Sequence, residues 1–256
     1  MPTQSEKAKH FHALHVKGDP IILFNVWDAG SAKTVADAGA KALATGSLPV
    51  AMARGYADGE NIPLTDVLAN ISRIVEQTDL PVSLDFEGAY SAEPAGIIGN
   101  VTRALDTGIV GLNFEDQIVG TDQLYDIQTQ GQRVAAARRA IDESGSGAYL
   151  NARTDIFLKA PREHHDKAML KQAIERADVF IAEGADGFFA PGLADPDLIG
   201  ELCTAVSVPV NIIALPGVPS TATLKQKGVA RISYGPVPYR QLMATLGDIA
   251  KEAFAG

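Results

Sequence analysis

Short apolar runs recur eight times along the chain, each followed by a stretch with helical periodicity, and this alternation most constrains how the chain can fold. Gly, Pro, Asp or Ser bound the runs, and their spacing suits a strand followed by a helix. The runs are Ile21–Asp28, Ala42–Ser47, Val82–Glu87, Gly111–Asp116, Ala148–Asp155, Gly187–Pro191, Pro209–Leu215 and Arg231–Gly235. Eight such units close into a (β/α)₈ barrel, the TIM barrel, whose active site lies at the carboxyl ends of the strands. The sequence therefore predicts an α/β barrel.

The length of 256 residues favours one barrel over two smaller domains. We therefore predict a single domain over residues 1–256, with a leading N-terminal helix at Thr3–Val16. Apolar periodicity is absent from Gln117–Gln130, between the fourth strand and a basic helix near Gln132–Ser144. Long loops at this end of a barrel are typically functional. We expect residues 117–130 to form a lid over the active site.

The charge and the cysteine content of the chain exclude several kinds of partner and site. A formal net charge of −9, from 22 basic and 31 acidic residues, argues against nucleic acid or anionic membrane as partners. No apolar segment has the length of a signal peptide core or a membrane span, which predicts a cytoplasmic location. Cys203 is the single cysteine. An intrachain disulfide and a thiolate metal cluster are therefore impossible, and the helical setting of Cys203 predicts a packed core thiol.

Two neighbouring strands are expected to direct carboxylates into the barrel. Side chains alternate along a strand, so Asp85 and Glu87 share one face of the third strand while Leu84 and Phe86 share the other. Large apolar residues on a barrel strand belong under the surrounding helices, which turns both carboxylates inward. Glu115 follows the same pattern on the fourth strand. The alternative for these acids is to cap helices or to form ion pairs at the rim.

Carboxylates gathered in the mouth of a barrel repel one another. They are tolerable at neutral pH only if protons or a divalent cation offset their charge. Oxygen ligands without cysteine or paired histidines favour a hard cation, Mg²⁺ first and Mn²⁺ second. The sequence therefore predicts a magnesium site at this end of the barrel.

Arg153 on the fifth strand also faces inward by alternation, which suggests an anionic ligand. Its planar guanidinium can bind a carboxylate or an oxyanion through two hydrogen bonds. A salt bridge to Glu115 or Asp155 is the structural alternative, and both roles can hold at once. The turn Thr45-Gly46-Ser47 could present N–H groups and a hydroxyl to the same anion. Gly and Ser also end strands for conformational reasons alone.

In order and spacing, these segments resemble the isocitrate lyase/phosphoenolpyruvate mutase superfamily over most of the chain. The motifs that carry the resemblance are Asn25-Val-Trp-Asp-Ala-Gly-Ser-Ala32, Thr45-Gly46-Ser47, Asp58 in Gly55-Tyr-Ala-Asp-Gly59, Asp85-Phe-Glu87-Gly-Ala-Tyr90, Asn113-Phe-Glu115-Asp116-Gln117 and Asn151-Ala-Arg153-Thr-Asp155. Any single motif could arise by chance, whereas the ordered set is specific. The resemblance implies a barrel enzyme that acts on a 2-oxo acid or its enolate.

The resemblance also implies how a metal ion is held. In that superfamily, the aspartate matching Asp85 binds Mg²⁺ directly, and acids matching Asp58, Glu87 and Glu115 hold its water molecules. The arginine matching Arg153 contacts the ligand. Arg153, Glu115 and Asp58 are accordingly the candidate catalytic residues.

The resemblance places the substrate against two further parts of the barrel. The strand-two turn, Thr45, Gly46 and Ser47, contacts the ligand together with Arg153. Asn211, near the end of the seventh strand, matches a position where members of the superfamily often carry a ligand-contacting asparagine. The alternative for Asn211 is a cap on the backbone at the end of the strand.

The lid departs from the best-known members. Isocitrate and methylisocitrate lyases carry a catalytic cysteine in a Lys-Lys/Arg-Cys-Gly-His motif after the Glu-Asp pair, whereas this chain reads Gln117-Ile-Val-Gly-Thr-Asp-Gln-Leu-Tyr125. The mutase pattern, a lid asparagine after a lysine, is missing too. Thr121, Asp122 and Tyr125 are the lid groups able to exchange protons. Thr121 is the candidate catalytic residue of the lid, with a solvated loop threonine as the alternative.

These features predict a Mg²⁺-dependent lyase that acts on a small 2-oxo carboxylate through an enolate, by C–C cleavage or decarboxylation of an oxaloacetate-like substrate. Three alternatives stay open: a (methyl)isocitrate lyase-type enzyme with a replaced acid, a phosphonopyruvate or phosphoenolpyruvate mutase or hydrolase, and a non-catalytic binder of 2-oxo acids. By resemblance we expect a homodimer or homotetramer. Relatives exchange a C-terminal helix, here expected at Tyr239–Phe254, and whether this chain does so stays open.

Overall fold

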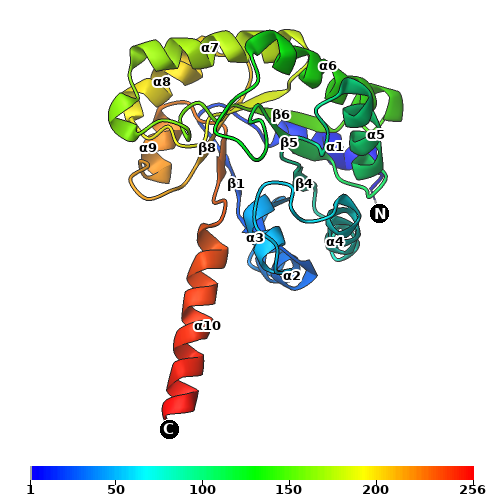
Figure 1. Ribbon diagram of the computed structural model, residues 1–256, viewed down its shortest axis with the longest axis vertical. Helices are drawn as coiled ribbons and strands as arrows, with labels where there is room; N and C mark the ends of the chain where they lie inside the picture. Colours follow the sequence, from blue (N-terminus) through cyan, green and yellow to red (C-terminus); the bar gives the residue numbers. More distant parts are fainter. Residues whose placement is uncertain (1) are drawn as a thin grey trace.

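Nine short parallel strands form one sheet that curls into a nearly closed barrel with helices around it (Figure 1). The computed structural model describes residues 2–256. The strands are β1 (Ile21–Leu23), β2 (Asn25–Val26), β3 (Leu43–Thr45), β4 (Val82–Asp85), β5 (Gly111–Glu115), β6 (Tyr149–Arg153), β7 (Gly187–Phe189), β8 (Val210–Ile213) and β9 (Arg231–Ser233). Their order is β1-β9-β8-β7-β6-β5-β4-β3-β2. The predicted α/β barrel is confirmed.

The first predicted strand, Ile21–Asp28, divides into two pieces. β1 pairs with β9, whereas β2 pairs with β3, so the pieces occupy the two ends of the sheet order. Phe24 separates them in the chain. Together β1 and β2 correspond to one barrel strand, which pairs with β9 through its first part and with β3 through its second part. The nine observed strands therefore correspond to the eight predicted runs.

Helices accompany the strands, and most of them cover the outside of the barrel. They are α1 (Gln4–Ala13), α2 (Ala29–Asp37), α3 (Ser47–Met52), α4 (Leu64–Glu76), α5 (Pro94–Leu105), α6 (Ile127–Ser144), α7 (Lys167–Ala182), α8 (Pro196–Ala205), α9 (Thr221–Gln226) and α10 (Val237–Ala255), with a 3₁₀ turn at Arg162–His164. No helix within residues 2–256 is long and apolar enough to cross a membrane.

The predicted start of the basic helix, near Gln132, is wrong. Helix α6 begins at Ile127 because the Asp126 carboxylate caps it, accepting hydrogen bonds from the backbone N–H groups of Gln128 (3.1 Å) and Thr129 (2.9 Å). The irregular segment after β5 is therefore shorter than expected and ends at Asp126.

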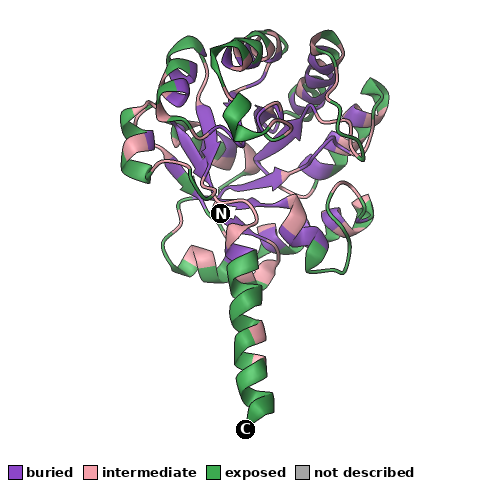
Figure 2. Ribbon diagram, turned by 60° about the vertical axis from the view of Figure 1, so that its left-hand side comes forward, coloured by how far each residue is buried: buried purple, intermediate pink, exposed green. Residues whose placement is uncertain are grey.

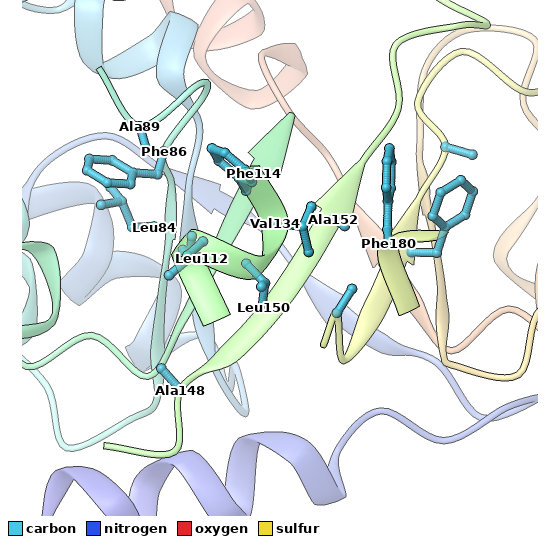
Figure 3. Close-up of a cluster of buried hydrophobic side chains, with 14 of the residues drawn as sticks. Leu84, Phe86, Ala89, Leu112, Phe114, Val134, Ala148, Leu150, Ala152 and Phe180 are labelled. Carbon is cyan, nitrogen blue, oxygen red and sulfur yellow. The ribbon is translucent and has the colours of Figure 1, made fainter. Parts of the chain in front are cut away.

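The apolar side of the strands packs under the helices, as the alternation predicts. Leu84, Phe86, Leu112 and Phe114 are each at most 2% exposed and lie in the main hydrophobic core (Figure 3). Burying side chains of this size is worth about 1.5–3 kcal/mol each. That gain fixes which face of β4 and β5 points outward, and it leaves the acidic residues of both strands facing the barrel interior. Cys203 lies in the same core, as predicted.

The leading helix α1 closes the amino end of the barrel. Its Phe11 is fully buried with Ile21 and Leu23 in a second, smaller core. The His15 ring stacks on the Tyr149 ring, with centroids 4.1 Å apart. Because this end is filled by apolar and aromatic side chains, the opposite, carboxyl end of the strands is the one open to ligands.

Helix α10 does not pack on its own barrel. It projects away from the other elements (Figure 1), and almost all of its length is exposed (Figure 2). Pro238 and Tyr239, in its first turn, are its buried residues.

Candidate active site

A cavity of about 260 Å³ opens at the carboxyl ends of the strands. Its walls bring together many of the predicted site residues, namely Asp58, Asp85, Glu87, Glu115, Arg153, Gly46 and Ser47. The strand-end location is the one where barrel enzymes carry their active sites. Residues more than 100 positions apart in the sequence thus share one wall.

Strand register explains why these side chains are neighbours. Asp85, Asn113 and Asn151 occupy one row across β4, β5 and β6. Glu115 and Arg153 occupy the next inward-facing row on β5 and β6. In a parallel sheet, side chains of one row and one face lie side by side. Each row therefore places an acid next to a hydrogen-bond donor.

The Asp85 carboxylate is held from two sides. Its Oδ2 accepts a hydrogen bond from the Ser47 backbone N–H (3.0 Å), and its Oδ1 accepts one from Asn113 Nδ2 (3.2 Å). The Asp85 backbone N–H donates to Thr45 Oγ1 (3.0 Å). Thr45 is almost fully buried and does not line the cavity. The structure thus places Thr45 behind Asp85, where it positions the carboxylate.

Glu87 lies in a turn with left-handed backbone. Glu87, Ala89 and Tyr90 have φ values of 50°, 60° and 56°, a region that costs energy for residues other than glycine. Glu87 Oε1 accepts hydrogen bonds from the backbone N–H groups of Gly59 and Glu60, both 3.1 Å. These bonds tie the turn to the loop that carries Asp58.

Glu60 makes the reciprocal connection. Its Oε1 accepts hydrogen bonds from the backbone N–H groups of Gly88 (3.0 Å) and Tyr90 (2.7 Å). Each of the two glutamates therefore holds the backbone beside the other. This exchange compensates for the strained conformation of the turn and fixes where the Glu87 carboxylate lies.

The cavity concentrates negative charge. Burial, and after it the carboxylates of Asp58 and Asp85, raises the pKa of Glu87 to about 8. Burial also raises the pKa of Glu115 well above its ordinary value, against the opposing effect of Arg153. Acids with raised pKa values in one cavity indicate a site that favours bound protons or a cation.

The residues present fit a hard divalent cation with few direct protein ligands. Within residues 2–256, no three His, Cys, Asp or Glu side chains converge closely enough to hold a metal ion directly. The scheme predicted from the resemblance, with Asp85 as the direct ligand and Asp58, Glu87 and Glu115 reaching the ion through water, stays a prediction; all four carboxylates line the cavity. Such oxygen-rich, partly hydrated coordination is typical of Mg²⁺.

Arg153 is engaged by two acids. Its Nη1 lies 2.9 Å from Glu115 Oε2, and its Nη2 and Nε both donate to the Asp155 carboxylate. Both salt bridges considered from the sequence are thus present. A guanidinium has five N–H donors, so donors remain for a ligand in the cavity that Arg153 lines.

Thr121 and Asn211 lie outside the cavity wall. Thr121 is exposed, and its hydroxyl donates to Ile118 O (2.8 Å) within the lid. Asn211 is buried in the barrel, where its Nδ2 donates to Ile212 O, to Arg231 O and to Ser233 Oγ. The structure therefore assigns Asn211 to the strand-end cap and Thr121 to the folding of its own loop.

Three further residues at the site were not anticipated from the sequence: Glu60, Arg133 and Arg240. Arg133 on α6 is 2% exposed, and its Nη2 donates to Gly88 O (3.1 Å). Arg240 lines the cavity from the first turn of α10. The sequence carries no signal that separates Arg133 from the neighbouring arginines of α6, because only tertiary packing decides which one is buried. Glu60 stands two residues after Asp58, and that proximity was the one available hint.

The chain is similar to known proteins over most of its length. Over residues 11–254, the chain matches the family described as phosphoenolpyruvate phosphomutase. A candidate phosphonomutase from Burkholderia cenocepacia J2315 has a crystal structure that superposes with a TM-score of 0.95. It is 45% identical in sequence, and the match covers 98% of this chain and 99% of that one.

Two other similar proteins are named enzymes. The 2-methylisocitrate lyase of Escherichia coli strain K12 is 26% identical, over 88% of this chain and 77% of its own length. The oxaloacetate decarboxylase of Pseudomonas savastanoi pv. phaseolicola is 24% identical, over 98% of this chain and 87% of its own length. Relatives of the chain therefore include a decarboxylase and a carbon–carbon lyase.

Proposed function

The chain belongs to the phosphoenolpyruvate phosphomutase family, within the isocitrate lyase/phosphoenolpyruvate mutase superfamily, and on that basis we propose that it is a Mg²⁺-dependent lyase that decarboxylates or cleaves a small, oxaloacetate-like 2-oxo acid. The observation that carries this proposal is the convergence of Asp58, Asp85, Glu87, Glu115 and Arg153 on one cavity. Fold alone would not be sufficient, because barrels support many chemistries.

In this proposal the carboxylates hold the ion, and Arg153 binds the substrate. Asp85 would bind the ion directly, and the hydrogen bonds that it accepts from Ser47 and Asn113 fix the direction of its oxygens. Asp58, Glu87 and Glu115 would hold water molecules around the ion. When bound, Mg²⁺ supplies positive charge next to the 2-oxo oxygen, where negative charge develops as the bond breaks. Arg153 binds the substrate carboxylate or the developing oxyanion through its remaining donors.

The lid favours decarboxylation among the possible reactions. The hydroxyl of Thr121 is directed into the lid itself, and Gln117, the lid residue that lines the cavity, carries a neutral amide. In decarboxylation the bond to the departing carboxyl carbon breaks, its electron pair becomes that of the enolate, and CO₂ leaves. Water then supplies the proton that converts the enolate to the product. This reaction needs no acidic group on the lid.

One observation favours a second candidate function. The similarity to the candidate phosphonomutase, 45% identity over nearly the whole of both chains, exceeds the similarity to the named lyase and decarboxylase. The same cavity could therefore act on a P–C bond next to a 2-oxo group. The lid residues that help to steer phosphoryl transfer in the mutase pattern are missing here, which is why we rank this function second.

A direct assay separates these functions. The purified protein is tested with Mg²⁺ against oxaloacetate, methylisocitrate, isocitrate and phosphonopyruvate, and pyruvate, glyoxylate and phosphate are measured separately. We expect pyruvate from oxaloacetate, lost in Asp85→Ala. Glyoxylate would indicate a carbon–carbon lyase, and phosphate would indicate P–C chemistry. Absence of turnover together with tight binding of 2-oxo acids would instead indicate a binding protein.

A further inference from the structure

We propose that Arg240 determines substrate specificity by binding a second anionic group of the substrate, the one that does not contact the metal site. This inference rests on the proposed function and deepens it. It assigns the cavity to 2-oxo acids that carry a distal carboxylate, and it predicts weak binding of 2-oxo acids without one.

The position of Arg240 follows from the junction between β9 and α10. Arg240 lines the cavity together with Ser233, Gly235 and Pro236. Around the barrel, β6, which carries Arg153, is separated from β9 by β7 and β8. The two arginines therefore enter the cavity from different parts of its rim. A ligand held by Arg153 at one end can present its other end to Arg240.

The backbone of this junction is fixed before any ligand binds. Asn25 Oδ1 accepts hydrogen bonds from the backbone N–H groups of Tyr234 (2.9 Å) and Gly235 (2.7 Å). Tyr239 is buried, with its ring edge-on to Trp27 at a centroid distance of 5.2 Å. Arg240 is the next residue, so its Cα is held in place although its side chain is exposed. Such preorganisation reduces the entropic cost of binding.

Charge distinguishes Arg240 from the other cation at the site. Arg153 and Arg240 are the cationic side chains that line the cavity. Arg153 is paired with Glu115 and Asp155, whereas no salt bridge found within residues 2–256 involves Arg240. Arg240 thus retains its full capacity for a two-bond contact with an incoming carboxylate.

The wall between the two arginines is apolar. Phe189, Ile213 and Leu215 line the cavity and come from β7, from β8 and from the segment after β8. They offer no hydrogen bonds from their side chains to a charged group. An anionic end of the substrate is therefore favoured at the arginines and disfavoured between them, which makes Arg240 selective for ligands long enough to reach it.

Loss of the Arg240 charge should change KM rather than kcat. If the distal carboxylate is the one lost as CO₂, its negative charge moves to the enolate in the transition state. Arg240 then binds the ground state at least as well as the transition state, and its removal raises KM without lowering kcat. We expect Arg240→Gln to raise KM for oxaloacetate about tenfold, with partial restoration in Arg240→Lys.

The decisive experiment measures binding by calorimetry with Mg²⁺ present, using two ligands. Oxalate lacks a distal group, whereas 3,3-difluorooxaloacetate carries one. We expect Arg240→Gln to weaken binding of difluorooxaloacetate about tenfold and of oxalate less than twofold. Arg139→Gln, an exposed arginine on α6, is the matched control and should change neither.

Other outcomes overturn the inference. Equal weakening of both ligands would show that Arg240 acts as a general positive charge, and unchanged binding of both would show that it does not contact the ligand. If the wild-type protein bound neither ligand and did not act on oxaloacetate, the proposed function would fail as well. The two failures are therefore distinguishable.

Discussion

At the scale of single residues, the fold itself fixes the position of the Asp85 carboxylate. Its carboxylate accepts hydrogen bonds from Ser47 and Asn113, and its backbone is held by Thr45. The orientation of Asn113 is itself fixed, because Asn113 Oδ1 accepts hydrogen bonds from Asn151 Nδ2 (2.9 Å) and Arg231 Nη2 (3.0 Å). The Asn113 NH₂ group must therefore point toward Asp85.

The substitution Asp85→Asn keeps the size of the side chain but removes its charge. Its NH₂ group also replaces one of the two oxygens that accept hydrogen bonds from Ser47 and Asn113. We expect it to abolish the rise in melting temperature that Mg²⁺ gives the wild-type protein and to lower turnover by about 100-fold or more. Thermal unfolding with and without Mg²⁺ measures the first effect. The control is Asp122→Asn in the lid, a fully exposed acid, which should keep the wild-type response. A normal Mg²⁺ response in Asp85→Asn would contradict the assignment of the direct ligand.

His15 gives a prediction about pH away from the active site. Burial, and after it the positive charge of Arg231, lowers the pKa of His15 from 6.5 to about 3. Below pH 6.5, His15 binds a proton in the unfolded chain but stays neutral in the folded protein. The contribution of neutral His15 to the free energy of unfolding is therefore complete above pH 6.5. It is lost as the pH falls toward 3, at up to about 1.4 kcal/mol per pH unit.

This loss is testable by urea unfolding between pH 7 and pH 4.5. His15→Gln should show a shallower fall in the free energy of unfolding over this range than the wild-type protein. His164→Gln, at an exposed histidine in the 3₁₀ turn, is the control and should leave the slope unchanged. If His15→Gln and the wild-type protein lost stability in parallel, His15 would not be the titrating group.

Much of the site could be predicted at this scale because side chains alternate along strands. Asp85, Glu87, Glu115 and Arg153 were placed in the cavity by that rule, and the cavity wall contains all four. Thr45, Asn211 and Thr121 do not line that cavity, and their predicted contacts with a ligand stay predictions. Each one forms hydrogen bonds within the fold that depend on neighbouring strands or on the course of the loop. Sequence alone does not reveal such partners.

At the scale of elements, the turn from Phe86 to Tyr90 depends on helix α6. Arg133 donates from Nη2 to Gly88 O and from Nη1 to the carbonyl oxygens of Ser91 (2.8 Å) and Ala92 (3.0 Å). Its guanidinium also lies 4.1 Å from the ring centroid of Tyr125 in the lid. One buried side chain thus connects the strained turn, the helix and the loop that precedes this helix.

We predict that Arg133→Ala destabilises the protein by about 2–4 kcal/mol, because three backbone carbonyl oxygens lose their charged donor and a buried side chain is removed. Amide hydrogen exchange should increase at residues 86–92 and in the lid. Arg139→Ala is the matched control on the same helix, since Arg139 is exposed and pairs with Glu143. The same exchange pattern in both variants would show that Arg133 has no special role in holding the turn.

The boundaries of elements were harder to predict than their existence. All eight strand–helix units were located from periodicity, yet the start of α6 was placed five residues late. The signal was present in Asp126, whose side chain caps the backbone N–H groups of Gln128 and Thr129 in the first turn. The break between β1 and β2 had no comparable signal, because it results from closing the barrel with one strand that pairs on both sides.

At the scale of the whole molecule, helix α10 and the first strand expose complementary apolar surfaces. In α10, Leu242, Leu246 and Ile249 recur at helical spacing and are 52%, 57% and 59% exposed. A groove beside β1 and α2 is lined by apolar residues that include Ile22 and Phe24, each 37% exposed. In a closed barrel, the helix after the last strand usually covers the first strand. Here α10 points away from that place (Figure 1).

We infer that the groove of each copy receives α10 from a second copy, which makes the protein a homodimer or a higher homo-oligomer. An exposed apolar helix and an exposed apolar groove on one molecule are each unfavourable in water. Exchange between two copies buries both at once and is a low-cost route to a symmetric assembly. This inference agrees with the assembly expected from the resemblance to the superfamily.

The double substitution Leu246→Asp/Ile249→Asp tests this exchange. Burial of each side chain is worth about 1.5–3 kcal/mol, so replacing both with charged groups should raise the dissociation constant of the assembly by at least 100-fold. Sedimentation at micromolar concentration should then show monomers, with the circular dichroism of the barrel retained because neither residue contributes to its core. Asp248→Ala, between the two positions and exposed, should leave the assembly intact. If the double variant sedimented like the wild-type protein, the contact between copies would lie elsewhere and α10 would need another partner.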